Sequence, residues 1–531
     1  MYDSAADVPD QTLQDQIDPS TNKTLTKSIA SMIDSMTGSK DIGLDDDVFA
    51  NGLDSRQVQV VAATLARALP EQKDVMSIQN AVYMNPTAHG LVEHISQNKT
   101  KDVSATFDGL FKKYSSTLLQ PPKQAPQPKE THHVLLTGRT GFVGGLVLQS
   151  LLNHPAVTEM ICINRRRIPD TNSKPEPSSN KTLTHLKADL SKPSFALSKT
   201  EYTHLVSTVT EIIHCQWPVT FNLPLALFEP QIAGTTNLIQ LAYDSPNNTR
   251  IIFLSTIATI QGWDKAPTPV PEGPLDDENA LNYAQGGYGQ SKLLASKILE
   301  QASIPSGVPS AICRVGQVAG PVDADGVWPP RDWFPTLLRA SETMGVLPNS
   351  LGHFNEVDWL PVDYLSGALV TLAVDRDLGG FRTDKPKTGG KRKRERKPEG
   401  SRSGAAYYHL TNPSISSYTD LVPGIRRRLE KGREIEVVET LEEWTERLDG
   451  WTSSSERGGS IADGGERDVE SSMAAAAALL EFYQGLARDL DKPSVKLDMA
   501  LTVKKIPALR DVGAVNEGWI ERWLDQWGVG Q

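Results

Sequence analysis

The stretch that decides the fold of this chain is His132-His-Val-Leu-Leu-Thr-Gly-Arg-Thr-Gly-Phe-Val-Gly144. A short run rich in valine and leucine leads into three spaced glycines, and a helical pattern with one apolar face follows. Glycines at such a turn let the backbone approach a pyrophosphate at a helix N-terminus. The stretch therefore predicts a strand, a glycine-rich turn and a helix. Taken alone, the glycines fit a phosphate site and a tight structural turn equally well.

Strand-like runs recur along the chain and alternate with helical patterns. They are Val134 to Leu136, Met160 to Ile163, Leu183 to Lys187, Glu211 to His214, Ile251 to Ser255 and Ala311 to Val315. Strands that are separated by helices form βαβ units, in which the strands run parallel. We therefore predict an α/β fold with a doubly wound parallel sheet of the Rossmann type.

The composition argues against several classes of protein. The length of 531 residues allows roughly two to four domains. A net charge of −11 argues against a nucleic-acid or acidic-membrane partner, and three scattered cysteines are too few for a disulfide framework or a zinc cluster. The acidic N-terminus does not have the pattern of a signal peptide, and no apolar run approaches the roughly 20 residues that span a bilayer. We expect a cytoplasmic protein that binds no metal, membrane or nucleic acid.

Shifts in composition divide the chain into four predicted regions. Residues 1–22 form a polar, acidic and disordered tail, and residues 23–97 carry helical patterns. Residues 98–130 form a linker that is Pro-rich at 120–129, and residues 131–531 carry the α/β pattern.

Two polar stretches interrupt the last region. Residues 383–404 and 452–472 are expected to be flexible insertions. The first contains the basic run Lys391 to Lys397, for which a solvated loop is favoured over a nuclear-localisation or nucleic-acid patch.

A serine at a helix start marks the N-terminal region. The stretch Leu44-Asp-Asp-Asp-Val-Phe-Ala-Asn-Gly-Leu-Asp-Ser55 precedes apolar residues at helical spacing, which are Val58, Val61, Ala62, Leu65 and Leu69. Gly52 supplies the turn, and Ser55 falls in the first helical turn, where free backbone N–H groups favour a phosphate. On Ser55 alone, a plain N-cap serine is the simpler interpretation.

The pattern Asp-x-Phe-x-x-x-Gly-Leu-Asp-Ser resembles the attachment site of acyl and peptidyl carrier proteins. The resemblance extends over residues 23–97 and includes Val82-Tyr-Met-Asn-Pro-Thr87 before a last helix. It implies that a phosphopantetheinyl transferase attaches 4′-phosphopantetheine to Ser55. Arg56 departs from the pattern, because carrier proteins usually have leucine after the serine.

A second constellation lies on a predicted helix that opens with Gly287-Tyr288-Gly-Gln-Ser-Lys292. Tyr288 and Lys292 are spaced i and i+4 and therefore share one helix face. An adjacent ammonium stabilises a phenolate, which makes the pair a credible proton donor, although a surface Tyr/Lys pair is the plainer interpretation of an isolated motif. The stretch Phe253-Leu-Ser-Thr256 precedes the pair at the carboxyl end of a predicted strand, where open α/β sheets bind their ligands.

Arginines follow the second strand of the predicted sheet. A site for NAD usually has Asp or Glu there to bind the ribose 2′-hydroxyl, whereas this chain has Arg165, Arg166 and Arg167. Arginine suits a 2′-phosphate, so the sequence favours NADP(H) over NAD.

The glycine-rich turn, the Ser/Thr pair and the Tyr-x-x-x-Lys motif together resemble extended short-chain dehydrogenase/reductases. Four further segments resemble the thioester reductase domain of fungal adenylate-forming reductases, carboxylic acid reductases and aminoadipate reductase, and they are 211–222, 228–238, 357–363 and 408–413. Residue by residue, core and loop packing remains the plainer interpretation of His214, Trp217, Trp359 and Asp363.

The resemblance implies a set of site residues. It implies that Thr256, Tyr288 and Lys292 are catalytic, with Ser255 as the alternative to Thr256. It implies a cofactor site made of Gly138, Thr140, Gly141, Phe142, Val143, Gly144, Arg165, Asp189, Tyr288 and Lys292. The substrate is expected in a smaller, mostly helical part at about residues 325–360 and 415–531.

The resemblance also implies a reaction, in which NADPH reduces a carrier-bound acyl thioester and releases an aldehyde, or an alcohol after a second reduction. The setting would be secondary metabolism or the reduction of amino or aryl acids. Family members begin with an adenylation domain, and no ATP-binding loop of that type precedes residue 23. We therefore expect a separate adenylating enzyme, or an adenylation domain missing from this chain, to supply the acyl group. Two alternatives remain open, a redox-inactive release domain that cyclises the bound chain and a non-catalytic carrier and dinucleotide-binding scaffold.

Overall fold

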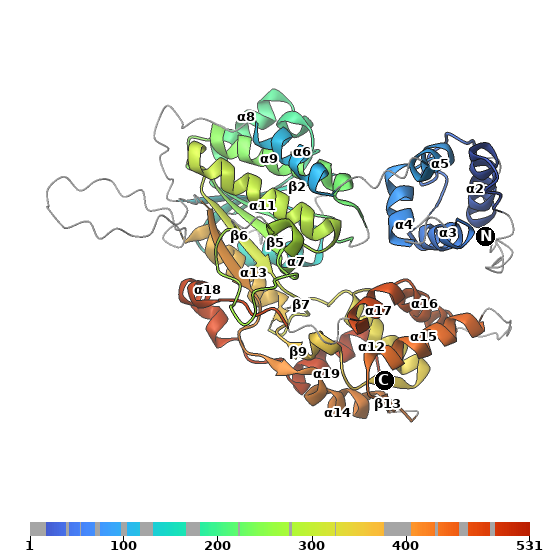
Figure 1. Cartoon of the computed structure of the whole chain (residues 1–531). Helices are drawn as coiled ribbons and strands as arrows, with labels where there is room; N and C mark the ends of the chain where they lie inside the picture. Colours follow the sequence, from blue (N-terminus) through green and yellow to red (C-terminus); the bar gives the residue numbers. More distant parts are fainter. Residues whose placement is uncertain are drawn as a thin grey trace, which may run out of the picture. The chain divides into compact units, whose positions relative to one another are not determined.

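The computed structural model (Figure 1) describes most of the chain. The described residues are 17–38, 42–53, 55–69, 75–96, 103–116, 131–165, 181–220, 223–275, 279–323, 325–375, 405–430, 434–455, 466–488 and 494–530. Their contacts form two compact units, of which the first is Met1–Leu110, Thr220–Glu229 and Gly286–Tyr288, and the second is Phe111–Val219, Pro230–Gln285 and Gly289–Gln531. No described helix is long and apolar enough to cross a membrane.

The N-terminal part of the first unit is a helical bundle. Its helices are α2 (Asn22–Thr37), α3 (Ser55–Ala68), α4 (Val75–Met84) and α5 (Ala88–Ser96). The apolar face predicted for α3 is buried, because Val58, Val61, Ala62 and Leu65 are each 0% exposed in the core of the bundle. Thr21 is the N-cap residue of α2 and forms a capping box, in which its side chain accepts a hydrogen bond from Thr24 N. A further helix, α6 (Val103–Ser115), lies within residues 98–130, which were predicted to form a linker.

A seven-stranded parallel sheet forms the centre of the second unit, in the order β11-β6-β5-β4-β1-β2-β3. Its strands are β1 (His132–Thr137), β2 (Val157–Asn164), β3 (Thr182–Lys187), β4 (Glu211–His214), β5 (Arg250–Thr256), β6 (Ser310–Val315) and β11 (Ala405–Leu410). The predicted α/β fold and its six strands are confirmed, and β11 is an additional strand that the sequence patterns did not indicate. The chain passes from β3 to the other side of β1, so the order in which strands are added reverses between β1 and β4.

Helices cover both faces of this sheet (Figure 1). The side chains of Val134 and Leu136 in β1 are buried in a core that includes residues of α7 (Phe142–Asn153) and α13 (Val362–Val374). The helices α8 (Lys199–Thr208), α9 (Glu229–Asp244) and α11 (Gly286–Ser306) lie on the other face. Every strand of the sheet thus ends at the same edge, between two helical layers.

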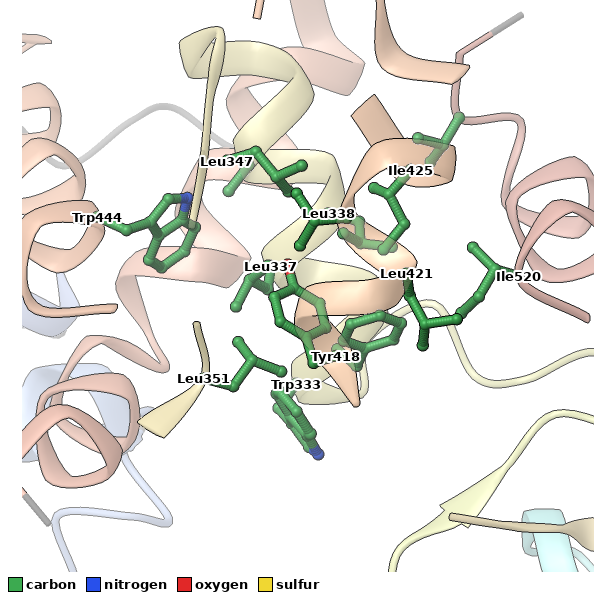
Figure 2. Close-up of a cluster of buried hydrophobic side chains, with 14 of the residues drawn as sticks. Trp333, Leu337, Leu338, Leu347, Leu351, Tyr418, Leu421, Ile425, Trp444 and Ile520 are labelled. Atoms are coloured by element: carbon green, nitrogen blue, oxygen red, sulfur yellow. The ribbon is translucent and has the colours of Figure 1, made fainter. Parts of the chain in front are cut away.

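The C-terminal part has its own core, which Figure 2 shows in part. Trp333, Leu337 and Leu338 on α12 (Trp333–Met344) lie beside Tyr418 and Leu421 on α14 (Tyr418–Leu429). The other helices here are α15 (Leu441–Ser455), α16 (Glu466–Ala477), α17 (Leu480–Arg488), α18 (Ala500–Lys505) and α19 (Glu517–Trp527). Short strand pairs complete this part, namely β7 (Val318–Ala319) with β10 (Leu360–Pro361), β8 (Val346–Pro348) with β13 (Glu436–Val438), and β9 (Glu356–Val357) with β12 (Ser416–Ser417).

Two predicted polar segments contain more structure than their composition indicated. Residues 452–472 were expected to be an unpacked insertion, yet α15 continues to Ser455 and α16 begins at Glu466. In the N-terminal tail, Ile17 is 7% exposed and belongs to the core of the helical bundle. The insertion at 383–404 and the Pro-rich segment at 120–129 lie outside the described residues.

Candidate functional site

The glycine-rich turn lies at the end of β1, where the strand order of the sheet reverses. Gly138 follows β1 with φ +78°, and a Cβ atom there would lie 2.8 Å from Gln216 N, just beyond the end of β4. A Cβ atom at Gly144 would lie 2.2 Å from Gly138 O. Only glycine fits both positions, because the turn packs backbone against backbone. The carboxyl ends of β1 and β4 are where a doubly wound sheet with this strand order binds a dinucleotide.

The start of α7 offers unpaired backbone donors to a phosphate. Gly141 is the N-cap residue of α7, and no side chain caps the helix. The first N–H groups of a helix lack partners within the helix and favour an anion. A cavity of about 440 Å³ opens here, with Arg139, Thr140, Gly141 and Phe142 among its lining residues on one side and residues 325–327 on the other. The residues of the turn therefore fit the pyrophosphate of a dinucleotide.

The structure describes only some of the residues that are expected to bind the adenosine part of NADPH. Arg165 directly follows β2 and is exposed. Arg166 and Arg167 lie outside the described residues. Asp189 lies beyond the end of β3, where its carboxylate accepts hydrogen bonds from Ser191 N at 3.0 Å and Ser191 Oγ at 2.7 Å. The carboxylate of Asp189 thus has local partners, and its role toward a cofactor stays a prediction.

Helix α11 is fixed closely to the end of β5. Its N-cap residue Gln285 donates its backbone N–H to Ala258 O at 2.9 Å, and a Cβ atom at Gly289 would lie 2.5 Å from the same oxygen. Ala258 lies in the short turn that follows Thr256. Tyr288 and Lys292 occupy the first two turns of α11 and share one face of the helix, as the spacing predicted.

The ammonium of Lys292 is buried against the sheet. Its Nζ donates to Leu254 O and lies 4.4 Å from the ring centre of Trp217 and 4.7 Å from that of Phe253. Burial lowers the pKa of Lys292 to about 7, since removal from water disfavours the charged form. The two aromatic rings partly compensate for the lost water.

A buried histidine lies beside this lysine. His214 ends β4, and its Nδ1 lies 2.7 Å from the hydroxyl of Thr137, which ends β1. Burial, and then the charge of Lys292, lower the pKa of His214 to about 3, so the imidazole is neutral at pH 7. Trp217 donates Nε1–H to Ser291 Oγ at 3.2 Å, which joins the end of β4 to α11. His214 and Trp217 hold the sheet edge together, as the packing interpretation of these residues predicted.

The two candidate hydroxyls at the end of β5 differ in their surroundings. Ser255 lies 3.2 Å from Ser296 on α11, oxygen to oxygen, and is buried in the helix–sheet interface. Thr256 is the last residue of β5, and its Oγ1 accepts from Ala258 N at 3.2 Å. Thr256 therefore lies at the strand end, whereas the hydroxyl of Ser255 already has a side-chain partner.

A second cavity lies next to this strand end. Its volume is about 330 Å³, and it is lined by Ile257, which follows Thr256, and by Gln285, the N-cap residue of α11. Glu356, Asp358 and Lys496 line it from the C-terminal part. Sequence reasoning missed Asp358, because its only signal was an acidic residue between the apolar Val357 and Trp359.

Two other motif residues pack as expected. Trp359 is 0% exposed in the C-terminal core. Asp363, at the start of α13, accepts hydrogen bonds from Val322 N at 3.0 Å and Asp323 N at 2.6 Å, and so holds the loop that lines the cavity at the glycine-rich turn.

Ser55 is the first residue of α3, as expected for a carrier serine. Gly52, three residues earlier, has φ +101°, a backbone conformation that favours glycine. Leu53 between them is buried in the core of the bundle. The geometry provides the turn and helix start of the motif, and attachment at Ser55 stays a prediction.

Comparison with known proteins identifies relatives of this chain. Residues 136–369 match the NAD-binding family model described as male sterility protein. The chain is 30% identical to carboxylic acid reductase from Neurospora crassa over 533 residues, which cover 96% of this chain and 47% of that protein. It is also 30% identical to adenylate-forming reductase Nps10 from Heterobasidion annosum over 358 residues, 62% of this chain and 32% of that protein. This chain thus spans less than half the length of either relative.

Solved structures share the fold. The terminal R domain from the myxalamid PKS-NRPS biosynthetic pathway has a TM-score of 0.59 at 23% identity and covers 80% of this chain and 97% of that domain. A thiolation-reductase di-domain from an archaeal nonribosomal peptide synthetase has a TM-score of 0.58 at 16% identity and covers 96% of this chain and 98% of that chain. Residues 136–369 thus match the NAD-binding family model, and the chain is similar in sequence to carboxylic acid reductase and in fold to the terminal R domain.

Proposed function

We propose that this protein is an NADPH-dependent thioester reductase that releases a carrier-bound acyl group as an aldehyde. One observation carries the proposal: Tyr288 and Lys292 share a face of α11, whose first residues are fixed to the turn after Thr256 at the carboxyl edge of the sheet. The glycine-rich turn at the same edge fits a dinucleotide. The relationship to carboxylic acid reductase supports the same reaction.

A thioester makes the reduction chemically feasible. A carboxylate resists hydride because it is already anionic, whereas a thioester carbonyl is electrophilic and can expel a thiolate. NADPH, when bound, supplies the hydride. The overall reaction joins one acyl thioester, one NADPH and one proton, and gives one aldehyde, one thiol and one NADP⁺.

Each proposed catalytic residue has a separate task. The hydroxyls of Thr256 and Tyr288 hydrogen-bond the oxygen on which negative charge develops, and Tyr288 gives it a proton. Lys292 places a positive charge one helical turn from Tyr288, where it would stabilise the phenolate and, with NADPH bound, would hold the nicotinamide ribose. Trp217 and His214 keep this lysine in place, since the indole stacks over its ammonium and the neutral imidazole adds no repulsive charge.

The cofactor and the carrier complete the proposal. The backbone N–H groups at the start of α7 would hold the pyrophosphate, and Arg165 the 2′-phosphate that distinguishes NADPH from NADH. The carrier part at residues 23–97 would bear phosphopantetheine on Ser55, attached by a phosphopantetheinyl transferase. An adenylating enzyme, or an adenylation domain of a longer protein, would load the acyl group. The three free cysteines fit the reducing cytoplasm, where we place the protein.

Two measurements test the proposal together. Incubation with a phosphopantetheinyl transferase and coenzyme A should add one phosphopantetheine by intact mass, and Ser55→Ala should remain unmodified. The loaded acyl group should then disappear with equimolar loss of NADPH and appearance of the aldehyde. Modification of Ser55→Ala would contradict the assignment of the serine, and release of the acyl group without NADPH consumption would favour the redox-inactive alternative.

A further inference from the structure

The cavity of about 330 Å³ beside the end of β5 is small and mostly apolar on its walls. Its apolar lining residues are Ile257, Phe354, Pro413, Ile415, Val495, Leu497 and Met499. Ligand cavities usually measure roughly 300–1,000 Å³, so this one suits a compact group rather than a long chain. Ile257 follows Thr256 directly, and Gln285 precedes Tyr288 by three residues, which places the cavity next to the proposed reaction centre.

Strand geometry directs Asp358 into this cavity. Val357 and Trp359 are each 0% exposed in the core of the C-terminal part. Successive residues of an extended chain point to opposite sides, so Glu356 and Asp358 point away from that core. Both residues line the cavity. The backbone is held here by Asn412 N, which donates to Asp358 O at 2.9 Å.

The two carboxylates differ in their partners. Glu356 lies 2.7 Å from Lys496 Nζ and also accepts from Ser494, so its charge is balanced. Within the described part of the chain, the carboxylate of Asp358 accepts a hydrogen bond only from its own backbone N–H. Burial, with a further contribution from Glu356, raises the pKa of Asp358 to about 6, although its own backbone N–H and the charge of Lys496 act in the opposite direction. The cavity therefore holds one carboxylate with acceptor capacity, and Lys496, which also lines the cavity, is hydrogen-bonded to Glu356 rather than to Asp358.

We propose that Asp358 selects the acyl group of the proposed reaction, favouring an apolar body with a hydroxyl at its far end and excluding one with a second carboxylate. A hydroxyl can donate to Asp358, whereas a second carboxylate would meet a like charge in an apolar cavity. Lys496 offsets only part of this repulsion, because it is paired with Glu356 and the pKa of Asp358 stays raised despite its charge. The inference rests on the proposed function of the same site.

Three isosteric probes test this selectivity, the N-acetylcysteamine thioesters of 4-hydroxybenzoate, 4-methylbenzoate and 4-carboxybenzoate. In the wild-type protein, kcat/KM from NADPH consumption should be roughly 10-fold higher for the hydroxyl probe than for the methyl probe, as for one hydrogen bond to a charged acceptor. It should be lowest for the carboxyl probe. Asp358→Leu should abolish the preference for the hydroxyl, and Asp358→Asn should raise kcat/KM for the carboxyl probe about 10-fold, since the like charge is gone. Asp420→Asn, an exposed residue on α14, should change neither ratio.

The pH dependence gives a further test of the same group. Below about pH 6 Asp358 takes up a proton, so the discrimination between the methyl and carboxyl probes should shrink from pH 7.5 to pH 5.5 in the wild type. It should not shrink in Asp358→Asn. The other charged groups that face the cavity, Glu356 and Lys496, are present in both proteins, as is Lys292, so the comparison of ratios cancels their titration.

Binding without turnover separates this inference from the proposed function. Titration calorimetry should show 4-hydroxybenzaldehyde binding more tightly than 4-methylbenzaldehyde to the wild type and equally tightly to Asp358→Leu. Equal binding to the wild type, or unchanged kcat/KM ratios in both Asp358 variants, would overturn the inference. Selective binding with no reduction of any thioester would support the inference and overturn the proposed function.

Discussion

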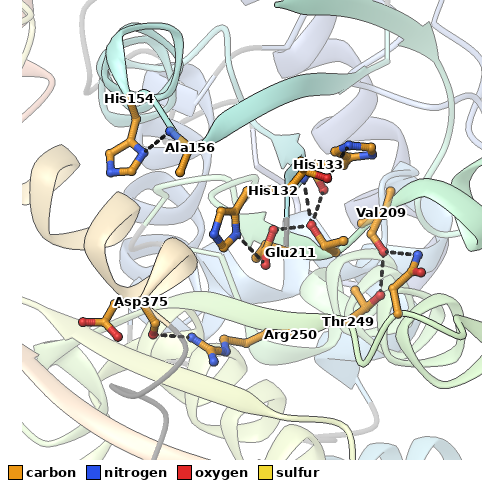
Figure 3. Close-up of polar contacts among 12 residues, drawn as sticks. His132, His133, His154, Ala156, Val209, Glu211, Thr249, Arg250 and Asp375 are labelled. Atoms are coloured by element: carbon orange, nitrogen blue, oxygen red, sulfur yellow. Dashed lines mark hydrogen bonds and ion pairs between the residues drawn. The ribbon is translucent and has the colours of Figure 1, made fainter. Parts of the chain in front are cut away.

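Buried ionisable side chains have different partners at the amino ends and at the carboxyl ends of the strands in the parallel sheet. At the amino ends, His132 Nδ1 lies 3.0 Å from Glu211 Oε1, and Thr210 donates to the other oxygen of that carboxylate (Figure 3). Arg250 donates to Leu372 O at 2.9 Å and Asp375 O at 2.8 Å at the same edge. At the carboxyl ends, the buried ammonium of Lys292 has a carbonyl and two aromatic rings around it, and no described carboxylate pairs with it.

This difference in partners indicates that the amino edge contributes to stability and the carboxyl edge to catalysis. A buried charge with a matched partner holds strands together, and removing one member leaves the other unpaired. A buried charge without such a partner lowers stability, and its pKa moves toward neutrality, as that of Lys292 does to about 7. Perturbed groups of this kind gather at functional sites. Substitutions at the carboxyl edge should therefore lower activity with little effect on stability. Substitutions at the amino edge should lower stability with little effect on activity.

The largest expected effect at the carboxyl edge comes from Tyr288→Phe. The substitution removes the proposed proton donor and keeps the ring, which contacts Phe228 edge-on. Turnover of a thioester should fall by roughly 100- to 10,000-fold, as for loss of a general acid. Single-turnover NADPH consumption measures the effect, while phosphopantetheine attachment at Ser55 and the melting temperature should stay unchanged. Tyr202→Phe on α8 is a matched control with full activity, and wild-type turnover by Tyr288→Phe would refute the assignment.

The converse change at the amino edge is Glu211→Gln. His132 and Glu211 have side chains that are 9% and 2% exposed, so water does not screen their pairing. Loss of the charged acceptor should lower the free energy of unfolding by about 1.5–3 kcal/mol. Thermal unfolding of the two proteins measures the difference, and NADPH consumption by the folded variant should equal that of the wild type. Glu430→Gln, in an exposed pair with Arg426 on α14, should cost less than about 1 kcal/mol.

A large loss of activity in folded Glu211→Gln would break the distinction between the edges. The distance between the two edges is the length of a strand, and nothing in the chemistry proposed for Tyr288 requires charge at the amino end. Equal melting temperatures for Glu211→Gln and wild type would show instead that the pair with His132 contributes nothing measurable to folding.

The two edges also differ in how far the sequence predicts them. Strands such as Arg250–Thr256 were predicted because buried parallel strands are short apolar runs between helices. The strand β11 was missed because Ala405-Ala-Tyr-Tyr-His-Leu410 has no β-branched residue and follows a long polar stretch. The glycine-rich turn and the Tyr288/Lys292 pair are local patterns, so sequence spacing was enough to find them. Asp358 and the ring of Trp217 over Lys292 depend on segments distant in sequence, so no local pattern indicates their contacts.

The smallest expected effect concerns the carboxyl end of β2, where Arg165 is exposed. An arginine there can bind the 2′-phosphate of NADPH, and NADH has a hydroxyl at that position. Arg165→Ala should raise the dissociation constant for NADPH by roughly 10-fold and leave that for NADH unchanged, because water screens an exposed pair and keeps the effect at the lower end for a charge-assisted hydrogen bond. Quenching of protein fluorescence by each nucleotide measures both constants without turnover.

Lys187→Ala, at the end of the neighbouring strand β3, removes an exposed cation at the same edge and is the matched control. Equal weakening of both nucleotides by Arg165→Ala would show that this arginine does not bind the 2′-phosphate, whereas a loss confined to NADPH would assign recognition of the 2′-phosphate to Arg165 at the carboxyl edge.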